Sequence, residues 1–507
     1  MNILSFYLGL HDSNACLFSG ATNEVQYFKS ERMTGVKRHR ADLKFIEDLC
    51  THNQFDPDLV CYSDGGRNGL GACPPNAVIK ELKLSERPTF RKARWYNVDH
   101  HMAHVLSAWP LADIGSVDIG VAIDGRGDHS RRISVFHKPA KLEPAIYTST
   151  THGVCHLFDE IGNKMGLAGH IADHAGKIMG AKAYGTVNHQ YVDALLMSGC
   201  ETDLPRVANG NERLFWPDAR ASWSLENAAF RDWLASVHDL LETIVQRVFK
   251  QHCLKDDQIA YSGGCALNSV FNQRLTANYP NLIIPPHCYD GGISIGLVKA
   301  LLLELGGPEP KLPRFPFAQS DEDFGYADTS TVHDVANVLA DGGIVGWLQG
   351  RGEVGPRSLG HRSILAHPGP SGTKDVLNSR IKRREAWRPY APSILEEYER
   401  AFFPEGVVSP YMLTTVNIAD HMRPLTGAVD HVDGTTRPQS VGVSVAPELH
   451  TYKQLLECFM DRTGLPALLN TSYNAGGRPV VANRSEALAL FRERRLDMLV
   501  LGNEVFR

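Results

Sequence analysis

Short apolar runs separated by polar, glycine-containing turns recur in the N-terminal part of the chain and predict paired β-strands. Residues 2–8 form one such run, and Ala15–Ser19 is expected to return beside it as a hairpin partner. The design recurs where an apolar strand, a turn beginning at Asp124 and a second strand near Ile133–Phe136 follow one another. Each strand–turn–strand unit therefore presents an acidic side chain at its turn.

Strands and turns that lead into helices are predicted further along. The segment DQIAYSGGCALNSVFNQRL predicts a strand, then a pair of glycines, then a helix beginning near Ala266. A turn at Asp290 followed by an apolar helix is predicted from HCYDGGISIGLVKALLLEL. The predicted fold class of the chain is α/β.

A segment rich in proline, glycine and acidic residues, residues 306–328, shows little periodicity and is the predicted linker. Beyond it we expect an amphipathic helix in TVHDVANVLADGG, a strand in IVGWLQG, a helix around Ser485–Arg494 and a last strand in DMLVLG. We therefore predict two domains, residues 1–318 and residues 319–507.

The composition is that of a globular protein, with 43% hydrophobic and 21% charged residues. The net charge of −5 gives no overall attraction to nucleic acid or to an anionic membrane, so we expect neither as a partner. The apolar N-terminal stretch has no basic leader and no small-residue cleavage site, and it is predicted to be a strand rather than a signal peptide. The ten cysteines form no Cys-x-x-Cys pair, which favours a reducing cytoplasm.

Three histidines fall within five positions of the segment NVDHHMAHVLSAWP. His100 and His104 would share one helix face, with Cβ atoms about 5–6 Å apart, whereas His101 would point about 100° away. Two imidazoles at that spacing can bind one cation, and Asp124 and Asp290 on turns are the expected carboxylate ligands. The alternative is a pair of histidines at the surface or at the edge of the core.

Glycine-rich turns form a second candidate site. Gly125 and Gly127 flank an arginine in IDGRGD, and Gly263 with Gly264 separates a strand from a helix in SGGCALN. Such turns let backbone N–H groups approach a phosphate, although a hairpin turn also accounts for the first. The segment HAGKIMGAKAYG adds Lys177 and Gly180, where the lysine either meets a phosphate or is solvated.

Cationic residues are dense in one stretch of the C-terminal part. They are Arg351, Arg357, Arg362, Arg380, Lys382, Arg383, Arg384 and Arg388. Arginine and lysine bind phosphate readily, and LLNTSYNAGGRPV adds the polar side chains of Ser472 and Asn474. A solvated charged helix around Lys382 is the alternative, and the interleaved Glu353 and Glu385 are not typical of a surface that tracks nucleic acid.

Taken in order, the motifs resemble the O-carbamoyltransferases of the nodulation-factor, cephalosporin and aminoglycoside-antibiotic type, over nearly the whole chain. The set is HDSNA, HHMAH, IDGRGD, GKIMGAKAYG, SGGCALN, DGGISIG, GPRSLGHRSIL, RREAWRPYAPS and LNTSYN. The resemblance implies an N-terminal actin-like (ASKHA) duplicated domain followed by a C-terminal YrdC-like α+β domain. The sequence departs from the family pattern at Arg126, Ala175 and Cys265, which concerns specificity rather than the class of reaction.

The resemblance also implies a two-step reaction. Carbamoyl phosphate and ATP, with Mg²⁺, would give carbamoyladenylate in the YrdC-like domain, and the carbamoyl group would then pass to a hydroxyl of a small-molecule acceptor. The residues that match the family's substrate site are Arg357, Lys382, Arg388, Ser472 and Asn474. The residues that match its divalent metal site, which holds iron in characterised relatives and so implies Fe(II), are His100, His104, Asp124 and Asp290.

His11 matches a family histidine near the acceptor and is the candidate general base, since imidazole titrates near neutral pH. Asp12 would orient it or the acceptor, and the alternative is that His11 only binds substrate. The expected cofactor-binding residues are Gly125, Gly127, Lys177, Gly180, Gly263, Gly264 and Asn268. Residues 61–75 and 186–225 are candidate acceptor loops, and the relatives suggest a homodimer.

Two other functions fit part of the pattern. A threonylcarbamoyl- or hydrogenase-maturation-type carbamoyl enzyme could act on a macromolecule. The sequence shows no acylphosphatase-like or zinc-finger cysteine segment, which argues against the maturation type, and the YrdC-like half that the resemblance implies argues against a simple tRNA partner. A non-catalytic ATP-binding switch like actin or Hsp70 would not need Arg357, Lys382 and Arg388 grouped with Ser472 and Asn474.

Overall fold

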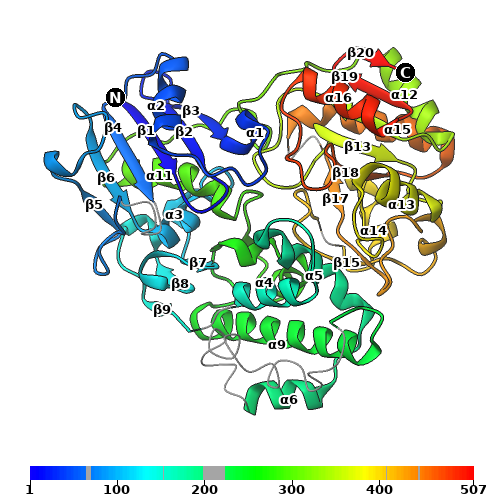
Figure 1. Cartoon of the computed structure of the whole chain (residues 1–507), viewed down its shortest axis with the longest axis horizontal. Helices are drawn as coiled ribbons and strands as arrows, with labels where there is room; N and C mark the ends of the chain where they lie inside the picture. Colours follow the sequence, from blue (N-terminus) through cyan, green and yellow to red (C-terminus); the bar gives the residue numbers. More distant parts are fainter. Residues whose placement is uncertain (64–69, 152–153, 198–222, 407, 443–445) are drawn as a thin grey trace. The chain divides into compact units, whose positions relative to one another are not determined.

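The chain forms two compact units in the computed structural model, which describes residues 1–63, 70–151, 154–197, 223–406, 408–442 and 446–507. Unit 1 comprises Met1–Val25 and Arg40–Lys311, and unit 2 comprises Gln26–His39 and Leu312–Arg507. Helices and sheets are present in each, so the predicted mixed α/β class is confirmed (Figure 1). The two units divide within the predicted linker, and the domain boundary after residue 318 stays a prediction.

Parts of both candidate acceptor loops, residues 64–69 and 198–222, lie outside the described residues. Among the described residues, no helix combines the length and the apolar character that crossing a membrane requires.

Unit 1 is built around two sheets, with strand orders β3-β2-β1-β4-β6-β5 and β11-β10-β7-β8-β9. The strands of the first sheet are β1 (Asn2–Tyr7), β2 (Asn14–Ser19), β3 (Glu24–Lys29), β4 (Leu59–Ser63), β5 (Ile79–Glu81) and β6 (Arg94–Val98). Those of the second sheet are β7 (Ile119–Ile123), β8 (Ile133–His137), β9 (Tyr147–Ser149), β10 (Ile259–Ser262) and β11 (Leu282–Ile283).

The two sheets repeat one topology. In each, a central strand pairs antiparallel with the next strand in sequence and parallel with a later one: β1 with β2 and β4, and β7 with β8 and β10. The parallel series continues from β4 to β6 and from β10 to β11. Both predicted hairpins are therefore confirmed, and the repeated order is what a duplicated domain produces.

Helices α3 (His100–Leu106) and α11 (Ile293–Glu304) pack against each other between these sheets, since α3 contacts β7 and β10 while α11 contacts β1, β2 and β4. The backbones of α3 and α11 approach closely because position 296 of α11 is a glycine, which has no side chain. A Cβ on Gly296 of α11 would lie 1.8 Å from the carbonyl oxygen of Ala103. On its other side α3 packs over Gly120 of β7, where a Cβ would lie 2.4 Å from Val105. The depth of α3 between its neighbours thus depends on two glycines.

Further helices of unit 1 are α2 (Leu43–His52), α4 (Val154–Lys164), α5 (His174–Ala181), α6 (His189–Met197), α9 (Ala228–His252) and α10 (Ser269–Asn278). Helix α10 begins later than the expected start near Ala266. The stretch Gly264–Leu267 forms a 3₁₀ turn instead, and the Asn268 side chain caps α10 by accepting hydrogen bonds from the N–H groups of Val270 and Phe271.

Unit 2 is built on a seven-stranded sheet with the order β17-β14-β18-β13-β12-β19-β20. Its strands are β12 (Val345–Leu348), β13 (Arg362–Ala366), β14 (Ala391–Leu395), β17 (Gln439–Val441), β18 (Ala467–Ser472), β19 (Met498–Leu501) and β20 (Glu504–Phe506). The small hairpin of β15 (Val416–Asn417) and β16 (Thr435–Thr436) is separate. The helices are α1 (Ser30–Thr34), α12 (Thr329–Ala340), α13 (Gly372–Val376), α14 (Glu399–Phe402), α15 (His450–Thr463) and α16 (Arg484–Arg494).

Helices cover both faces of this sheet because its central strands are apolar on both faces. Trp347 of β12 belongs to the core that includes α12 and α15, whereas Leu348 belongs to the core that includes α16. The near-continuous apolar runs of β12, β18 and β19 have this origin. The predicted helices and strands of this part are confirmed, with the last helix beginning one residue before Ser485, but the strand in DMLVLG is not the last, because β20 follows it.

Arg362, grouped above with the candidate anion binders, serves the fold instead. It is 0% exposed, and its guanidinium donates to Asp321 at 3.0 Å and to the carbonyl of Glu322 at 2.6 Å. It also donates to the carbonyl of Gln349 at 2.8 Å. A buried arginine whose donors are used in this way fastens residues 321–322 to the sheet.

The close crossing of α3 and α11 predicts that Gly296→Ala destabilises unit 1 by at least about 1–3 kcal/mol, because the added methyl group overlaps backbone atoms that cannot rotate away. Gly176→Ala in α5 is the control, since a Cβ there has no atom within 4 Å; that change should be neutral or stabilising by up to about 1 kcal/mol. Hydrogen exchange of α3 and α11 measures the difference. Equal protection in Gly296→Ala and in the unchanged chain would contradict the tight crossing.

Candidate metal centre and anion site

Helix α3 begins at the paired histidines because two carboxylates hold its first turn. Asp99 caps the helix by accepting a hydrogen bond from Met102 N at 2.9 Å. Asp128 Oδ2 accepts a hydrogen bond from His100 N at 2.9 Å. His100 and His104 therefore occupy one face of a regular turn, as their spacing predicted.

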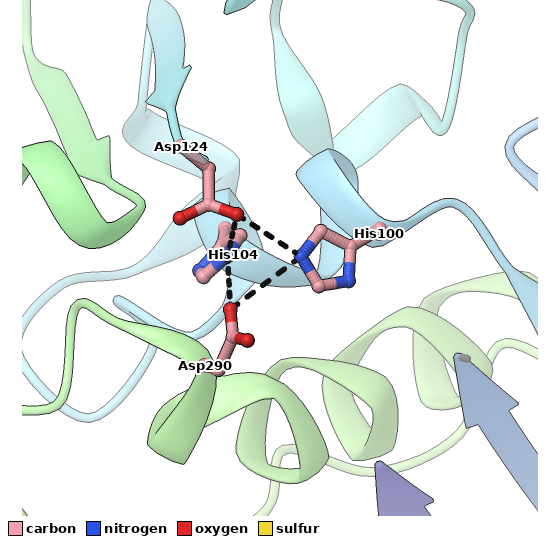
Figure 2. Close-up of side chains that lie close together, drawn as sticks. All are labelled: His100, His104, Asp124 and Asp290. Carbon is pink, nitrogen blue, oxygen red and sulfur yellow. Dashed lines mark ion pairs between the residues drawn. The ribbon is translucent and has the colours of Figure 1, made fainter. Parts of the chain in front are cut away.

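Four side chains from three segments converge on one point, as Figure 2 shows. His100 and His104 come from α3, Asp124 follows β7, and Asp290 precedes α11. One ligand atom from each residue lies within 4.8 Å of all the others. The Nε2 atoms lie 3.6 Å (His100) and 3.4 Å (His104) from Asp290 Oδ1, and 3.6 Å and 4.0 Å from Asp124 Oδ2.

These separations fit a divalent cation. Bonds of about 2.0–2.1 Å in a tetrahedral arrangement place neighbouring ligand atoms about 3.4 Å apart. The Nε2 atoms of His100 and His104 are buried and have no hydrogen-bond partner among the described residues, so they point to a ligand that the polypeptide does not supply. His101 is different, since its Nδ1 lies 2.7 Å from Ser134 Oγ.

Charge within the cluster also favours a cation. Burial lowers the pKa of His100, but the carboxylates of Asp124 and Asp290 outweigh burial and raise the pKa to about 10. Burial raises the pKa of Asp290, but the facing histidines outweigh it and hold the pKa well below its usual range. The carboxylates thus stay ionised and require positive charge beside them, which protons on the imidazoles or a metal ion can supply.

Neighbouring groups orient the four side chains. Tyr7 donates its hydroxyl hydrogen to Asp290 Oδ2 at 2.7 Å, and Gly264 N donates to Asp124 Oδ1 at 2.8 Å. Each carboxylate therefore keeps its other oxygen for the cluster. Sequence reasoning missed Tyr7, because a tyrosine at the end of an apolar strand carries no sign of a partner that lies far along the chain.

The candidate base lies beside the cluster. His11 Nδ1 lies 2.9 Å from Asp12 Oδ2 and 3.8 Å from Asp290 Oδ2. Asp12 is buried and has a φ of 58°, a left-handed conformation that aspartate tolerates better than most residues. The ring of His170 lies edge-on to His11 with centroids 5.5 Å apart. Asp12 is thus placed to orient the imidazole, as expected for a base or for a substrate-binding histidine.

The glycine turns use several of their N–H groups internally. Gly263 N donates to the carbonyl of Cys288 at 2.6 Å, Gly264 N donates to Asp124, and Gly127 N donates to the carbonyl of Arg131 at 2.8 Å. Gly125 has open space where a Cβ would lie. The glycines therefore shape the turns that place Asp124, and nucleotide binding at them stays a prediction.

The other residues that are predicted to bind the nucleotide lie on α5 and at the start of α10. Lys177 and Gly180 both lie on α5 and are largely buried, and the Lys177 ammonium donates to the carbonyl of Ala168. Asn268, besides capping α10, has its amide nitrogen 3.2 Å from His238 Nε2. The Asn268 side chain thus has a structural role in this structure.

In unit 2, three of the five candidate substrate residues bind one another directly. The Lys382 ammonium donates to Asn474 Oδ1 at 2.9 Å and to Ser472 Oγ at 3.3 Å, and it also contacts the Ser472 carbonyl. The stretch Leu377–Lys382 is a π-helix that ends at Arg383, whose φ is 46°. A π-helical turn therefore carries Lys382 instead of the solvated helix considered above, and such turns are frequent at functional sites.

Further cations surround Lys382. Burial first, and then the charges of Arg384, Arg388 and Lys37, lower the pKa of Lys382 well below its usual range. Burial and the charges of Arg357, Arg384 and Arg388 lower the pKa of Arg437 in the same direction. Among the described residues, Arg437 Nε has no hydrogen-bond partner. A group of like charges of this kind is suited to a bound polyanion.

Sequence reasoning did not select Arg437 as part of this group, because it stands alone in TTRPQS, far from the basic stretch. The two units thus define an α/β protein with one site suited to a divalent cation and another suited to phosphate-bearing anions.

Two family descriptions match the chain. "Carbamoyltransferase N-terminus" matches residues 76–298, and "Carbamoyltransferase C-terminus" matches residues 336–507. The chain is 30% identical over 448 residues to nodulation protein NolO of Bradyrhizobium diazoefficiens, covering 80% of this chain and 78% of that protein. The chain therefore belongs to the carbamoyltransferase family, and the resemblance seen in the ordered motifs is confirmed. The prediction of a carbamoyl-transferring enzyme is confirmed at this level.

Other proteins are also similar. Nodulation protein NolNO of Sinorhizobium fredii is 31% identical to this chain over 440 residues. The alignment covers 81% of this chain but only 63% of the length of NolNO. The 3'-hydroxymethylcephem-O-carbamoyltransferase of Amycolatopsis lactamdurans is 26% identical over 478 residues, covering 88% and 86% of the two chains. Among solved structures, the activator of 2-hydroxyisocaproyl-CoA dehydratase from Clostridium difficile aligns over 60% of this chain and 96% of its own chain, with 12% identity. The TM-score of this alignment, 0.36, is too low to establish a shared fold.

The hydrogen bond from Tyr7 predicts a defined effect on metal binding. Tyr7→Phe should lower the affinity for cobalt(II) or iron(II) by about 10–100-fold, because Asp290 loses the donor that orients it. Competition with a chromogenic chelator measures this. Tyr62→Phe is the control, since its hydroxyl donates to the carbonyl of Leu70 at 2.7 Å and lies outside the cluster. Equal affinities in the two variants would show that Tyr7 does not support the site.

Proposed function

We propose that the chain is an ATP-dependent O-carbamoyltransferase with a small-molecule acceptor, and that its two steps are divided between the two units. The observation that carries this proposal is the pairing of a buried cation site, at His100, His104, Asp124 and Asp290, with a buried group of like positive charges around Lys382. The first is suited to a metal ion and the second to phosphates, and an adenylating carbamoyltransferase needs both.

The first step is assigned to unit 2. Water hydrolyses carbamoyl phosphate to carbamate and phosphate, and a carbamate oxygen then attacks the α-phosphorus of ATP, so that carbamoyladenylate forms and pyrophosphate departs. Lys382 and Arg388 would hold the substrate, with Ser472 and Asn474 fixing the ammonium and Arg357 on the phosphate side. Mg²⁺ would accompany the ATP phosphates. Fixed donors around the phosphoryl group provide most of the stabilisation that such a reaction needs.

The second step is assigned to unit 1. The hydroxyl of the acceptor attacks the carbamoyl carbon, the bond to the phosphate oxygen breaks, and AMP leaves. His11, oriented by Asp12, would accept the hydroxyl proton. A divalent metal, iron(II) by the family resemblance, would be held by His100, His104, Asp124 and Asp290 and would supply Lewis acidity.

Finer aspects of the fold belong to this proposal. The repeated strand order of unit 1 supports an actin-like duplicated domain, and the seven-stranded mixed sheet of unit 2 supports a YrdC-like domain. A cephem carbamoyltransferase among the similar proteins supports a hydroxyl on a small molecule as acceptor. The proposal also includes binding of the nucleotide at the glycine turns. It further includes a homodimer and a cytoplasmic location.

A macromolecular acceptor or a non-catalytic ATP switch would use the fold differently. The switch is disfavoured by the cation group in unit 2, since Lys382 and Arg437 are buried among like charges at a cost that a mere switch does not require. Pyrophosphate release that depends on carbamoyl phosphate separates the enzyme from the switch. Mass spectrometry of a panel of candidate alcohols then separates small-molecule from macromolecular acceptors.

His104→Ala should separate the two steps. Carbamoyl transfer should fall by at least about 100-fold, because Lewis-acid stabilisation contributes several kcal/mol, while carbamoyl-phosphate-dependent pyrophosphate release continues. Metal content and both rates are measured. His101→Asn is the control and should keep one metal ion per chain, since His101 faces Ser134. Transfer at the unchanged rate in His104→Ala would contradict the metal assignment.

Arg388→Ala should have the reverse effect. Pyrophosphate release should fall by about 100-fold or more, since removing one preorganised donor commonly has an effect of that size. Metal binding should stay the same. Arg380→Ala is the control, because Arg380 lies in the same basic stretch but pairs with Asp497 at 4.0 Å with its side chain 42% exposed. Unchanged pyrophosphate release in Arg388→Ala would rule out this division of the reaction.

A further inference from the structure

The turn between β7 and β8 carries an arginine beside the candidate metal centre. Arg126 stands two residues after Asp124, and its backbone N–H lies 3.4 Å from Asp124 Oδ2. That oxygen is the one that faces His100 and His104, whereas Oδ1 accepts the hydrogen bond from Gly264 N (Figure 2). Arg126 therefore lies at the oxygen of Asp124 that belongs to the cluster, and the glycine turn predicted for the nucleotide lies at the other.

A hydrogen bond orients the exposed side chain of Arg126. Its Nη2 donates to Ser130 Oγ at 2.9 Å. Ser130 and the preceding His129 both have left-handed backbone conformations, with φ of 61° and 55°. Consecutive left-handed residues other than glycine are uncommon, and conformations of this kind cluster at ligand sites. The segment that places Ser130 beside the guanidinium is thus held in an unusual conformation.

The same turn contacts one of the candidate acceptor loops. His129 Nε2 lies 2.7 Å from the carbonyl oxygen of Cys73, which belongs to the candidate loop 61–75. A Cβ at Gly125 would have no atom within 4 Å, so the turn is open at this position. Arg126 thus stands on a turn that contributes a side chain to the metal cluster and contacts a segment predicted to meet the acceptor.

Among the residues that the structure describes, no carboxylate pairs with the guanidinium of Arg126. The metal centre does not need this charge, since a divalent cation would balance the two negative charges of Asp124 and Asp290. The guanidinium therefore adds net positive charge beside the centre. Arg126 is also one of the positions at which the sequence departs from the family pattern, as expected for a residue that sets specificity.

We propose that Arg126 binds an anionic group of the acceptor, such as a carboxylate, and so selects alcohols that carry a negative charge. This rests on the proposed function and extends it by naming the class of acceptor. The hydroxyl would lie at the cluster, and the anion would lie on the guanidinium, whose planar fork can bind two oxygens at once. An acceptor that carries an ammonium group would be repelled at the same position.

Three alcohols of equal length test this charge preference: 6-hydroxyhexanoate, 6-hydroxyhexanamide and 6-aminohexan-1-ol. Carbamoylation with carbamoyl phosphate and ATP is measured by mass spectrometry, and binding to the cobalt(II)-loaded chain is measured by calorimetry. We expect kcat/KM and affinity to be about 10-fold higher for the acid than for the amide, as for other hydrogen bonds between charged groups. The amine should be the poorest. Arg126→Gln should abolish the difference between acid and amide, Arg126→Lys should keep the order, and Arg126→Glu should make the amine the best.

Arg91→Gln is the matched control, because Arg91 is also exposed but precedes β6, at the opposite end of that strand from α3. It should leave the order of the three alcohols unchanged, and both Arg91→Gln and Arg126→Gln should keep one metal ion per chain.

The inference is overturned if the acid neither reacts faster nor binds more tightly than the amide in the unchanged chain, or if Arg126→Gln keeps the preference for the acid. It is also overturned if Arg126→Gln weakens inhibition by AMP and leaves the order of the alcohols unchanged, since the guanidinium would then bind the phosphate of the adenylate. Absence of pyrophosphate release that depends on carbamoyl phosphate would contradict the proposed function instead, while the calorimetric affinities would still test Arg126.

Discussion

The close crossing of α3 and α11 is the constraint on which the candidate metal centre depends. Two of its four side chains are on α3, and a third immediately precedes α11. The carbonyl of Ala103 lies where a Cβ of any residue other than glycine at position 296 would be. Because interiors are close-packed and transmit small displacements, an added methyl group at this crossing would move Asp290 away from the histidines.

The same crossing explains how a duplicated fold produces one asymmetric site. Helix α3 follows β6 of the first sheet yet packs on the second, while α11 follows β11 of the second sheet and packs on the first. Asp124 follows β7 and Asp290 lies between β11 and α11, so the second half of the repeat supplies both carboxylates, whereas both histidines lie on α3, which follows β6 of the first half. The two halves meet at one site because α3 packs on the second sheet.

Much of this arrangement could be predicted from local pattern. The spacing of His100 and His104 determines that they share a helix face, and the acidic turns follow apolar strands that sequence alone places well. The role of Tyr7 could not be predicted, because its partner Asp290 lies 283 residues away. Arg362 was grouped with the anion binders for a similar reason: composition shows a basic stretch, but only tertiary structure shows that Asp321 takes up this guanidinium. The membership of Gln26–His39 in unit 2 is likewise a tertiary fact.

The candidate sites of the two units have opposite charge preferences. Two ionised carboxylates in unit 1 require a cation, and burial makes that requirement stronger, since each unpaired ion in a protein interior is disfavoured by several kcal/mol. Buried ammonium and guanidinium groups in unit 2 require anions for the same reason. In the proposed reaction, the phosphate-bearing intermediate would form where cations stabilise the leaving pyrophosphate, and its carbonyl would be attacked where a Lewis acid and a histidine would be available. A single pocket would have to bind both a cation and phosphate anions with the same side chains, whereas two units would bind them with separate side chains.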